Sequence, residues 1–467
     1  MTSRLSAGTA LLVALGACTV GPDYHRPPVR VPDQWKEASP SDRELGADCW
    51  DRFKDARLSE LIRKALGANQ TIAQAAGRVA EAEALLRVAG AQQYPSVSLD
   101  PSANREKIFS GITSDATATR SIFRLPLSLS YEVDLWGRVR RTVEASRASY
   151  EASLADLALV KLGIASEVAQ TWFMLLHVDL DRQLLRETVE LRRQTRELVE
   201  KRLNNGVGSR LELAQSQVEL SQAASDLEGL ERTRALLEHA LAQLTGEPAP
   251  EVSFPFRALD VAVPALPVLL PSALLERRPD VAEAERRMIA ANAGIGAAEA
   301  AFYPTVNLGA LVGATSVDVT HLFRRSNMIW GLGAAASQPL FAGGAIEGGA
   351  DVAKAQYEET LAAYRQTVLV AFQEVEDALS SLTVLARQSE AQDQAVKAAR
   401  EAMALARRRY EEGLASLLDL LDAQRSLIGT QRTASLIYRD RLLASVLLLR
   451  SLGGGWAAGS VPAEKTP

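Results

Sequence analysis

The sequence predicts a mainly α-helical chain with a smaller β part, arranged as two copies of one unit. Three observations support this prediction. Two stretches of about 120 residues contain no proline and are rich in Ala, Leu, Glu, Gln and Arg, which favour helices. The two stretches resemble each other at a constant offset. Each follows a segment in which apolar and polar residues alternate, which is the period of a β-strand.

The offset between the two copies is 207 residues in the long helical stretches and 209 residues just upstream. The matching positions include Gly206 and Gly413, Ser209 and Ser416, Leu211 and Leu418, and Tyr94-Pro95 and Tyr303-Pro304. One register held over some seventy residues indicates a duplication rather than a shared composition.

The duplication defines the domain organisation. Repeat 1 covers residues 69–245 and repeat 2 covers 278–452, with a proline-rich linker at 246–277 and a C-terminal tail at 453–467. Each repeat opens with a short helix, at about 70–92 and 279–301, that ends at a Tyr-Pro pair because proline disfavours helix at the preceding residue. Two strands follow, at about 94–106 and 121–134 in repeat 1 and 304–314 and 327–340 in repeat 2. Polar loops are expected between them, near 104–120 and 315–326.

Each proline-free stretch then predicts a long helical hairpin. The first limb of repeat 1, about 138–203, has roughly 65 residues and would extend about 100 Å at 1.5 Å per residue. The returning limb, about 209–245, would cover about 55 Å, and the short helix about 35 Å more. Glycine ends the first limb at Gly206 and Gly413, and Ser209 and Ser416 are placed to cap the second.

The alternation in the strands has one apolar and one polar face. The apolar positions include Phe123, Leu125, Leu127, Leu129, Tyr131, Val133, Val306, Leu308, Ala310, Trp330, Leu332 and Ala334. Four such strands alone would leave two open edges. A half-buried sheet in a soluble protein is one interpretation. A membrane β-barrel, apolar outward and polar inward, is the other.

The N-terminus predicts a secreted lipoprotein. One basic residue, Arg4, precedes an apolar run that is too short for a permanent membrane helix, so residues 1–17 are interpreted as a cleaved signal peptide. The ending Leu15-Gly16-Ala17-Cys18 resembles a bacterial lipobox, in which Cys18 becomes the acylated first residue, carrying lipid such as palmitate. Residues 18–68 would then form a lipid-anchored N-terminal segment.

Composition and motifs argue against other functional classes. The net charge is −5, and Lys and Arg are spread along the chain, so no nucleic-acid partner is expected. The four histidines have no neighbours at metal-ligand spacing, and no Walker loop or Gly-x-Ser-x-Gly motif occurs. We therefore expect no enzyme, no metal and no cofactor other than the covalent lipid on Cys18.

Several motifs, taken in order, carry a resemblance to a known family. They are Gly21-Pro22-Asp23-Tyr24, Asp134-Leu135-Trp136-Gly137-Arg138, Pro339-Leu340-Phe341-Ala342-Gly343-Gly344 and the segment from Leu418 to Arg425. Across a duplicated chain, from Cys18 to Trp456, they resemble the outer-membrane factors, the TolC/OprM-like lipoprotein channels of tripartite efflux pumps.

The resemblance implies a homotrimer in the outer membrane of a Gram-negative bacterium. Each chain would give four strands to a shared twelve-stranded transmembrane β-barrel, and its helices to a long α-helical barrel in the periplasm. The linker and the chain ends would form an equatorial part. The resemblance also implies a periplasmic adaptor (membrane fusion) protein and an inner-membrane transporter, often of the resistance-nodulation-division type, as partners. The channel itself would be passive and would open at its periplasmic tip.

Two sets of tip residues follow from the resemblance. The adaptor would meet the turns, with Gly206, Val207, Gly208, Ser209, Gly413, Leu414 and Ser416 as the facing residues. The closed channel would be narrowest at Leu418, Asp422 and Arg425.

The gate segment also has a simpler interpretation. At about 100° per residue, Asp422 lies within 60° of Asp419 and Arg425, whereas Leu417, Leu420 and Leu421 lie opposite. That pattern fits a solvated stripe with an Asp–Arg pair three residues apart. Repeat 1 has no equivalent pair, because Gln215 and Val218 occupy the matching positions.

Two alternatives remain open at this point. An exit duct for type I protein secretion would have the same architecture. A lipid-anchored periplasmic coiled-coil protein, with a structural or adaptor role, would explain the helices and the lipobox but not the alternating strands.

Overall fold

The computed structural model describes residues 19–37, 46, 49–109, 117–257, 259–268 and 270–456. The predicted signal peptide, the predicted lipidation residue Cys18 and residues 457–467 lie outside this part of the chain. The chain divides into two compact units. The first contains residues 1–28, 78–153 and 283–365, and the second contains residues 29–77, 154–282 and 366–467.

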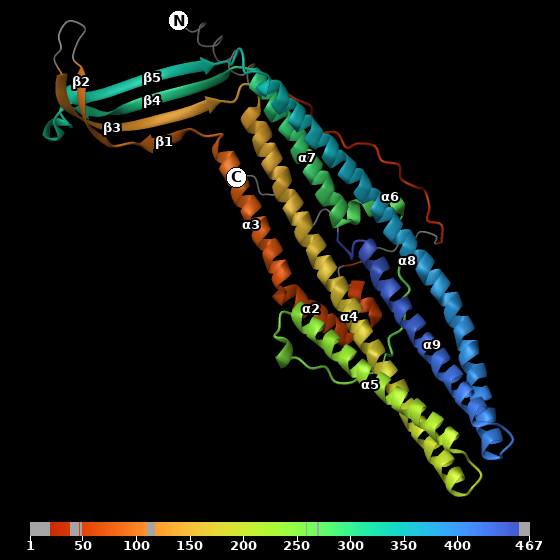
Figure 1. Cartoon of the computed structure of the whole chain (residues 1–467). Coiled ribbons are helices and arrows are strands. Elements are labelled where there is room, and N and C mark those ends of the chain that lie inside the picture. Colours follow the sequence, from red (N-terminus) through yellow and green to blue (C-terminus); the bar gives the residue numbers. More distant parts are fainter. Residues whose placement is uncertain are drawn as a thin grey trace. The chain divides into compact units, whose positions relative to one another are not determined.

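The two repeats contain the same series of helices (Figure 1). Repeat 1 has α3 (Gln70–Ala91), α4 (Arg138–Asn204) and α5 (Arg210–Leu244), and repeat 2 has α7 (Pro279–Glu299), α8 (Ala345–Glu411) and α9 (Leu417–Ser451). Both long helices have 67 residues and both returning helices have 35. Two shorter helices that we did not predict, α2 (Ala56–Ala68) and α6 (Pro271–Arg277), precede α3 and α7. No helix in the described ranges is both long and apolar enough to cross a membrane.

The hairpin turns have the same geometry in both repeats. Gly206 and Gly413 have φ of 77° and 78°, a left-handed conformation that glycine adopts without steric cost. The amide of the following residue donates to the carbonyl five residues earlier, at 3.0 Å from Val207 to Arg202 and 2.7 Å from Leu414 to Arg409. This is the Schellman pattern, which satisfies the carbonyls at a helix end.

The returning helices begin at the predicted serine caps. Ser209 Oγ accepts from the Glu212 amide at 3.1 Å, and the Glu212 carboxylate accepts from the Ser209 amide at 2.9 Å. Ser416 and Asp419 form the same reciprocal pair, at 3.2 and 2.9 Å. Both are capping boxes, so the prediction that these serines cap the helices is confirmed.

The strands of the first unit form one antiparallel sheet in the order β1-β3-β4-β5, with β2 also paired to β3. The strands are β1 (Ser96–Leu99), β2 (Ser102–Phe109), β3 (Thr117–Val133), β4 (Thr305–Ser316) and β5 (Met328–Ser337). β1 and β2 lie in one continuous register along β3, from Ser96 opposite Ser130 to Phe109 opposite Thr117. They therefore act as one strand interrupted at residues 100–101.

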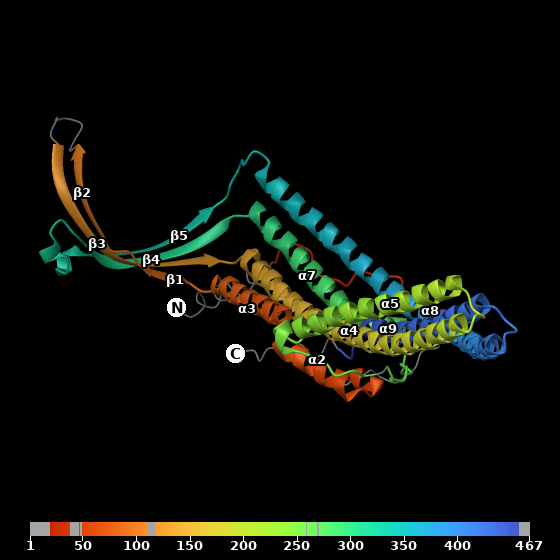
Figure 2. The ribbon, with the colours of Figure 1, turned by 60° about the horizontal axis from the view of Figure 1, so that its bottom comes forward.

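The predicted polar loop at 104–120 is wrong over most of its length, because β2 and β3 extend into it. The interruption between β1 and β2 in the ladder with β3 is explained by proline. Pro101 and Pro126 have no amide hydrogen to donate, and they lie close to each other on neighbouring strands. Farther along, past the last β3–β4 pair of Phe123 with Ser316, the hairpin of β2 and β3 turns away from β4 and β5 (Figure 2). Gly313 faces Pro126, and a Cβ on it would lie 2.4 Å from the Leu125 carbonyl oxygen.

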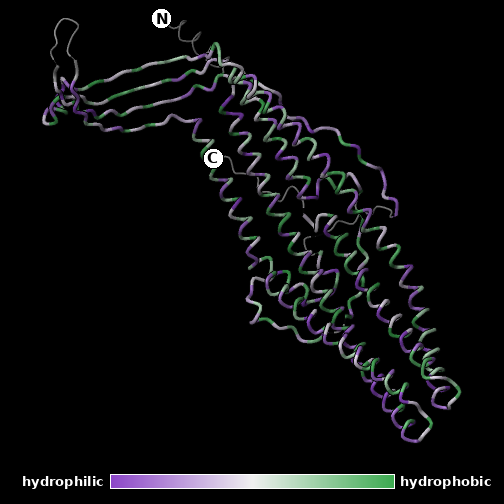
Figure 3. The backbone as a smooth tube through the Cα atoms, in the orientation of Figure 1, coloured by the Kyte–Doolittle hydropathy of each residue, from purple (hydrophilic) through white to green (hydrophobic). Residues whose placement is uncertain are grey.

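The sheet has the two faces that the alternation predicts. Cross-strand partners share a face, and one row joins Leu99, Leu127, Val312 and Trp330, whereas another joins Ser96, Ser130, Gly309 and Gly333. Hydrophobic and hydrophilic residues alternate along the strands in Figure 3. Trp330 is 78 % exposed and Leu332 is 79 % exposed. The apolar face is thus bare in the single chain.

Asp55 holds together three segments of the second unit. Its carboxylate caps α2 by accepting from the Arg57 and Leu58 amides at 3.0 and 3.2 Å. It also accepts from Trp172 Nε1 on α4 and from Arg257 Nη1 in the linker, both at 2.9 Å. Burial acts to raise the pKa of Asp55, but the hydrogen bonds from Trp172, Arg257 and Leu58 outweigh it and hold the pKa below the usual value.

We expect Asp55→Asn to destabilise the second unit by about 3 kcal/mol, because buried donors lose a charged acceptor. The measurement is the melting temperature of the purified protein, followed by circular dichroism. Because the folded-state pKa of Asp55 is depressed, its contribution is complete above the usual value of about 3.9 and is lost as pH falls through the lower folded-state pKa. The difference between wild type and variant should therefore shrink in strong acid.

Glu60→Gln is the matched control, since Glu60 makes only an exposed ion pair with Arg57. Equal melting temperatures for the wild type and Asp55→Asn would show that Asp55 does not have this role.

Candidate functional site

The two hairpin tips of the chain pack on one shared apolar cluster. Val199 of α4, Tyr410 of α8, and Leu417, Leu420 and Leu421 of α9 are buried together. Leu198 of α4 and Leu213 of α5 pack against them, so α4, α5, α8 and α9 all contribute. The leucines expected on the packing face of α9 therefore do pack, and the cluster joins the α4–α5 hairpin to the α8–α9 hairpin.

A cation–π contact reinforces this cluster. The Arg202 guanidinium lies 4.9 Å from the centre of the Tyr410 ring, and its Nη1 donates to the Tyr410 carbonyl oxygen at 3.0 Å. Both ends of the contact come from the last turn before a hairpin turn. At this level the two hairpins are thus held together by apolar packing and by the cation–π contact of Arg202 with Tyr410.

A partly buried polar network lies in the next turns of the same helices; we call it the tip bridge (Arg192, Glu219, Gln424 and Arg425). Arg192 of α4 forms an ion pair with Glu219 of α5 at 3.1 Å and donates to Gln424 of α9 at 2.6 Å. Arg425 of α9 donates to the same carboxylate, with its Nε 3.0 Å from Glu219 Oε1 and its Nη2 also in contact. Gln424 continues the network by donating to Thr195 at 3.1 Å.

The positive charges of the tip bridge outnumber its negative charges. One carboxylate serves two guanidinium groups, of which Arg192 has a side chain only 4 % exposed and Arg425 one 57 % exposed. Burial and the neighbouring Arg425 lower the pKa of Arg192 despite the opposing charge of Glu219. The hydrogen bond and charge of Glu219 raise the pKa of Arg425. Glu219 is therefore the group on which both cations depend.

The predicted gate residues all lie on the exposed side of α9. Leu418, Asp422 and Arg425 are exposed in the single chain. Asp422 makes no hydrogen bond or ion pair with any residue that the structure describes, although its charge acts on Arg425. The Asp–Arg pair considered from the sequence is thus replaced by the pair of Arg425 with Glu219. A pair within one exposed helix is worth little, whereas Glu219 is also fixed by the buried Arg192.

Asp419 has a different role from that of a solvated acid. Its carboxylate accepts from both the amide and the hydroxyl of Ser416, at 2.9 and 2.8 Å. These hydrogen bonds lower the pKa of Asp419. Asp419 belongs to the helix cap, and Asp422 is left as the acid that faces away from the packed side.

The residues predicted to face an adaptor lie in the two turns. Val207 and Leu414 occupy matching positions and are each 66 % exposed. Both point out of turns whose backbone hydrogen bonds are already satisfied. The structure therefore places two exposed aliphatic side chains at the ends of the hairpins.

Sequence reasoning missed Arg192 and Glu219, yet the repeat contains a signal for them. At the offset of 207, Arg192 matches Ala399, Glu219 matches Ser426, and Arg425 matches Val218. The charged members of the tip bridge are thus positions at which the two copies differ. Opposite charges at unmatched positions of a duplicated hairpin would have indicated a contact between the copies.

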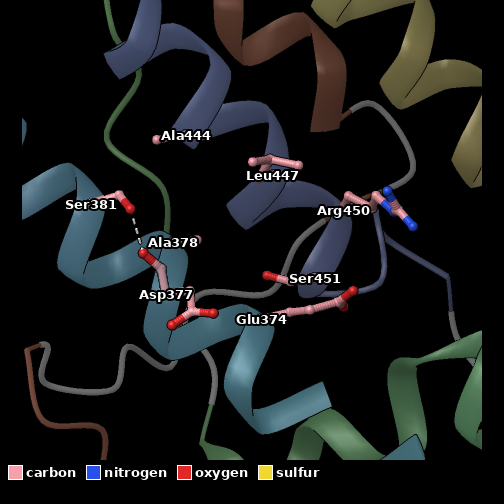
Figure 4. A pocket seen from close by; sticks show the side chains of 8 residues that line it. All are labelled: Glu374, Asp377, Ala378, Ser381, Ala444, Leu447, Arg450 and Ser451. Atoms are coloured by element: carbon pink, nitrogen blue, oxygen red, sulfur yellow. Dashed lines mark hydrogen bonds between the residues drawn. The ribbon is translucent and has the colours of Figure 1, made fainter. Parts of the chain in front are cut away.

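The second unit also has a pocket of about 210 Å³ between α8 and α9 (Figure 4), with Ala378, Ala444 and Leu447 among its lining residues. Its two carboxylates are already engaged, since Glu374 accepts from Arg278 at 2.6 Å and Asp377 accepts from Gln373 at 3.3 Å. Nowhere in the described ranges do three or more His, Cys, Asp or Glu side chains gather as a metal site.

We expect Glu219→Gln to loosen the tips, because Arg192 would remain buried without a carboxylate at a cost of about 3 kcal/mol. Hydrogen exchange of the purified protein should become faster in residues 192–219 and 411–426 and stay unchanged elsewhere. The control is Glu200→Gln, which removes only a pair within α4 with Arg196. Unchanged exchange in Glu219→Gln would contradict the importance of the bridge.

Comparison with known proteins identifies the family that has this architecture. The sequence model of the outer membrane efflux protein family matches residues 61–247 and 270–454. The two segments begin 209 residues apart and end 207 apart, which are the offsets of the internal repeat.

Curated relatives match over almost their full length. The pyoverdine export outer membrane protein OpmQ of Pseudomonas aeruginosa is 34 % identical, over 97 % of each chain. The cation efflux system protein CusC of Escherichia coli O6:H1 is 32 % identical, over 95 % of this chain and 97 % of the relative.

Among solved structures, the outer-membrane channel OprN superposes with a TM-score of 0.89 at 29 % identity, covering 94 % of this chain and all of that one. The fold, the repeat and the length of the match all agree. The chain belongs to the outer membrane efflux protein family.

Proposed function

We propose that this outer-membrane efflux protein works as a homotrimeric, passive exit duct whose periplasmic tips form the gate. The protein resides in the outer membrane of a Gram-negative bacterium and extends into the periplasm. The observation that carries the proposal is the sheet of the first unit. One chain leaves its apolar face bare and, among the residues that the structure describes, one edge of each outer strand unpaired.

Closure between chains would resolve both features. In a bilayer every backbone amide and carbonyl needs a partner, so only closed barrels and helices span it. β1 and β2 act as one strand, so each chain supplies four strands, and three chains would supply twelve. β5 of one chain would pair with the β1–β2 strand of the next. The row from Leu99 to Trp330 would face lipid, and the serine and glycine row would face the lumen.

The N-terminal segment supports a lipid anchor at the start of the helices. The Val20 amide donates to the Trp136 carbonyl oxygen at 3.0 Å, two residues after the predicted acylated Cys18. Trp136 stacks on Tyr303 at 4.7 Å and donates to the Pro304 carbonyl oxygen at 2.8 Å. Aromatic side chains with a polar end favour membrane interfaces. The lipid of Cys18 would enter the bilayer at this level.

In the trimer the exposed side of α9 would line the tip of the tunnel. Three Asp422 carboxylates about 6 Å apart would repel by roughly 0.7–3 kcal/mol per pair, depending on the local dielectric. Leu418 would narrow the opening further, and the residual negative potential would favour cations. The tip bridge holds Arg425 beside this ring, where it offsets the repulsion.

The remaining partners follow from the family. The turns with Val207 and Leu414 would contact a periplasmic adaptor, which would couple the duct to an inner-membrane transporter, for which we propose the resistance-nodulation-division type. The names of the relatives OpmQ and CusC describe pyoverdine export and cation efflux, so the family serves chemically different cargoes. These names favour efflux over type I secretion, and the sheet argues against a coiled-coil protein without a pore.

We expect Asp422→Ala and Arg425→Ala to make the closed tip more permeable, the first because the smaller side chain leaves a wider opening and the second because the repulsion between the Asp422 carboxylates is no longer offset. Cells that carry either variant should admit more vancomycin than wild type, and the purified channel should show a higher basal conductance in planar bilayers. Glu219→Gln should have the same effect, because it releases Arg425. Asp226→Asn, an exposed change on α5 away from the bridge, is the control. Wild-type values in both assays for Asp422→Ala and Arg425→Ala would rule out this gate.

The barrel predicts opposite results for two substitutions on one strand. Leu332→Arg puts a cation on the apolar face and should cost about 2–4 kcal/mol in lipid. Heat-resistant trimer on a gel and bilayer conductance should both be lost. Ala335→Arg puts the same cation on the opposite face of β5 and should keep both. Conducting trimers of Leu332→Arg would contradict a lipid-facing position.

A further inference from the structure

A second polar site lies at the end of the sheet farthest from the long helices. The segment after β4 folds back on itself through its own hydrogen bonds. Asp318 accepts from the Thr320 amide at 2.9 Å, Asn327 donates to the His321 carbonyl oxygen at 2.7 Å, and the Asp318 amide donates to Ser316 at 3.1 Å. The result is a defined wall rather than an open loop, and β3 provides the wall opposite.

The pocket between these walls has a volume of about 540 Å³. This lies within the range of roughly 300–1,000 Å³ that small-molecule sites occupy. Its cationic lining residues are Arg120 and Arg124 of β3 and Arg324 of the folded segment, together with the imidazole of His321. Hydroxyl and amide groups of Thr315, Ser316, Ser326 and Asn327 also line it, together with the Asp318 carboxylate and the apolar side chains of Ile122 and Val317.

The positive charge of this pocket is only partly neutralised. Arg120 donates twice to Glu106, at 3.0 and 3.1 Å. Arg124 and Arg324 form no ion pair with any residue in the described part of the chain, although the charge of Arg324 acts on Asp318. Asp318 is the nearest acid on the folded segment, and its carboxylate is engaged by Thr320 and lies 3.7 Å from His321. Two guanidinium groups are thus left to receive an anion.

The chemistry of the lining selects the class of anion. Guanidinium groups present paired N–H donors that match the oxygens of phosphate and bind them bidentately. Neighbouring hydroxyl and amide donors suit the remaining oxygens. We propose that this pocket, with Arg124 and Arg324 as its principal ligands, binds a phosphate group or a phosphate ester.

The faces of the sheet indicate how such a ligand would arrive. Arg120 and Arg124 lie on the same face of β3 as Ser128 and Ser130, which faces the lumen in the proposed barrel. Arg105 and Lys107 of β2 lie on the opposite face. A phosphorylated solute in the channel mouth and a phosphorylated sugar of outer-leaflet lipid are the two sources of the ligand. Only this choice of source rests on the proposed function; the binding itself does not.

The test is calorimetric titration of the full-length trimer in detergent with inorganic pyrophosphate at low ionic strength. We expect saturable binding by wild type and at least tenfold weaker binding by the double variant Arg124→Gln/Arg324→Gln. Arg105→Gln/Lys107→Gln is the matched control, because it also removes two positive charges, from the opposite face of the β2–β3 hairpin. No binding by wild type, or equal weakening by the control, would overturn the proposal.

A second measurement needs no variant. Phenylglyoxal modification of wild type, mapped by mass spectrometry, should be slowed by pyrophosphate at Arg124 and Arg324 but not at Arg105. Equal modification with and without pyrophosphate would overturn the proposal even if the variants failed to fold.

Titration with rough lipopolysaccharide, intact or dephosphorylated, then identifies the source. Phosphate-dependent binding that is lost in Arg124→Gln/Arg324→Gln supports the lipid as ligand. Lipopolysaccharide binding that depends instead on Arg105, alongside pyrophosphate binding that depends on Arg124 and Arg324, supports a soluble ligand. Gate behaviour at Asp422 is measured independently, so failure here leaves the proposed function intact.

Discussion

The unpaired edges and bare apolar face of the sheet are the constraint on which the rest of this protein depends. An isolated sheet of this kind has backbone donors without acceptors and tryptophan and leucine side chains in water, both of which are costly. A bilayer removes the second cost and closure between chains removes the first. A single chain therefore cannot by itself pair the edges of this sheet or cover its apolar face. The duplicated helices then follow from the strands, because each strand pair leads directly into one long helix.

Elements that depend on local sequence could be predicted to within a few residues. The long helices follow from proline-free runs, the turns from glycine followed by a capping serine, and the strand faces from strict alternation. The error at residues 104–120 has a local cause as well. Polar residues there suggested a loop, but cross-strand pairing carries the hairpin on past Pro101.

The tip bridge could not be predicted in the same way, because its partners are more than 200 residues apart along the chain. Helical periodicity indicates which residues share a face of α9, but not which residue of α5 lies opposite. Asp422 and Arg425 were therefore assigned to each other by spacing alone. The comparison of the two copies is more informative than either copy, since packing is duplicated and the charges are not.

The location of the tip bridge within one chain determines how a tip can move. If the α8–α9 hairpin swung away from α4–α5, Arg192 would lose Gln424 and Glu219 would lose Arg425, and each hydrogen bond to a charged group contributes about 1.5–3 kcal/mol. A displacement of both hairpins together leaves every one of these contacts in place. The tip bridge therefore makes movement of both hairpins together, as one rigid body, the least costly movement of the tip of one chain. If the tip of the proposed trimer dilates by movement of such bodies, sliding would be confined to the contacts between subunits.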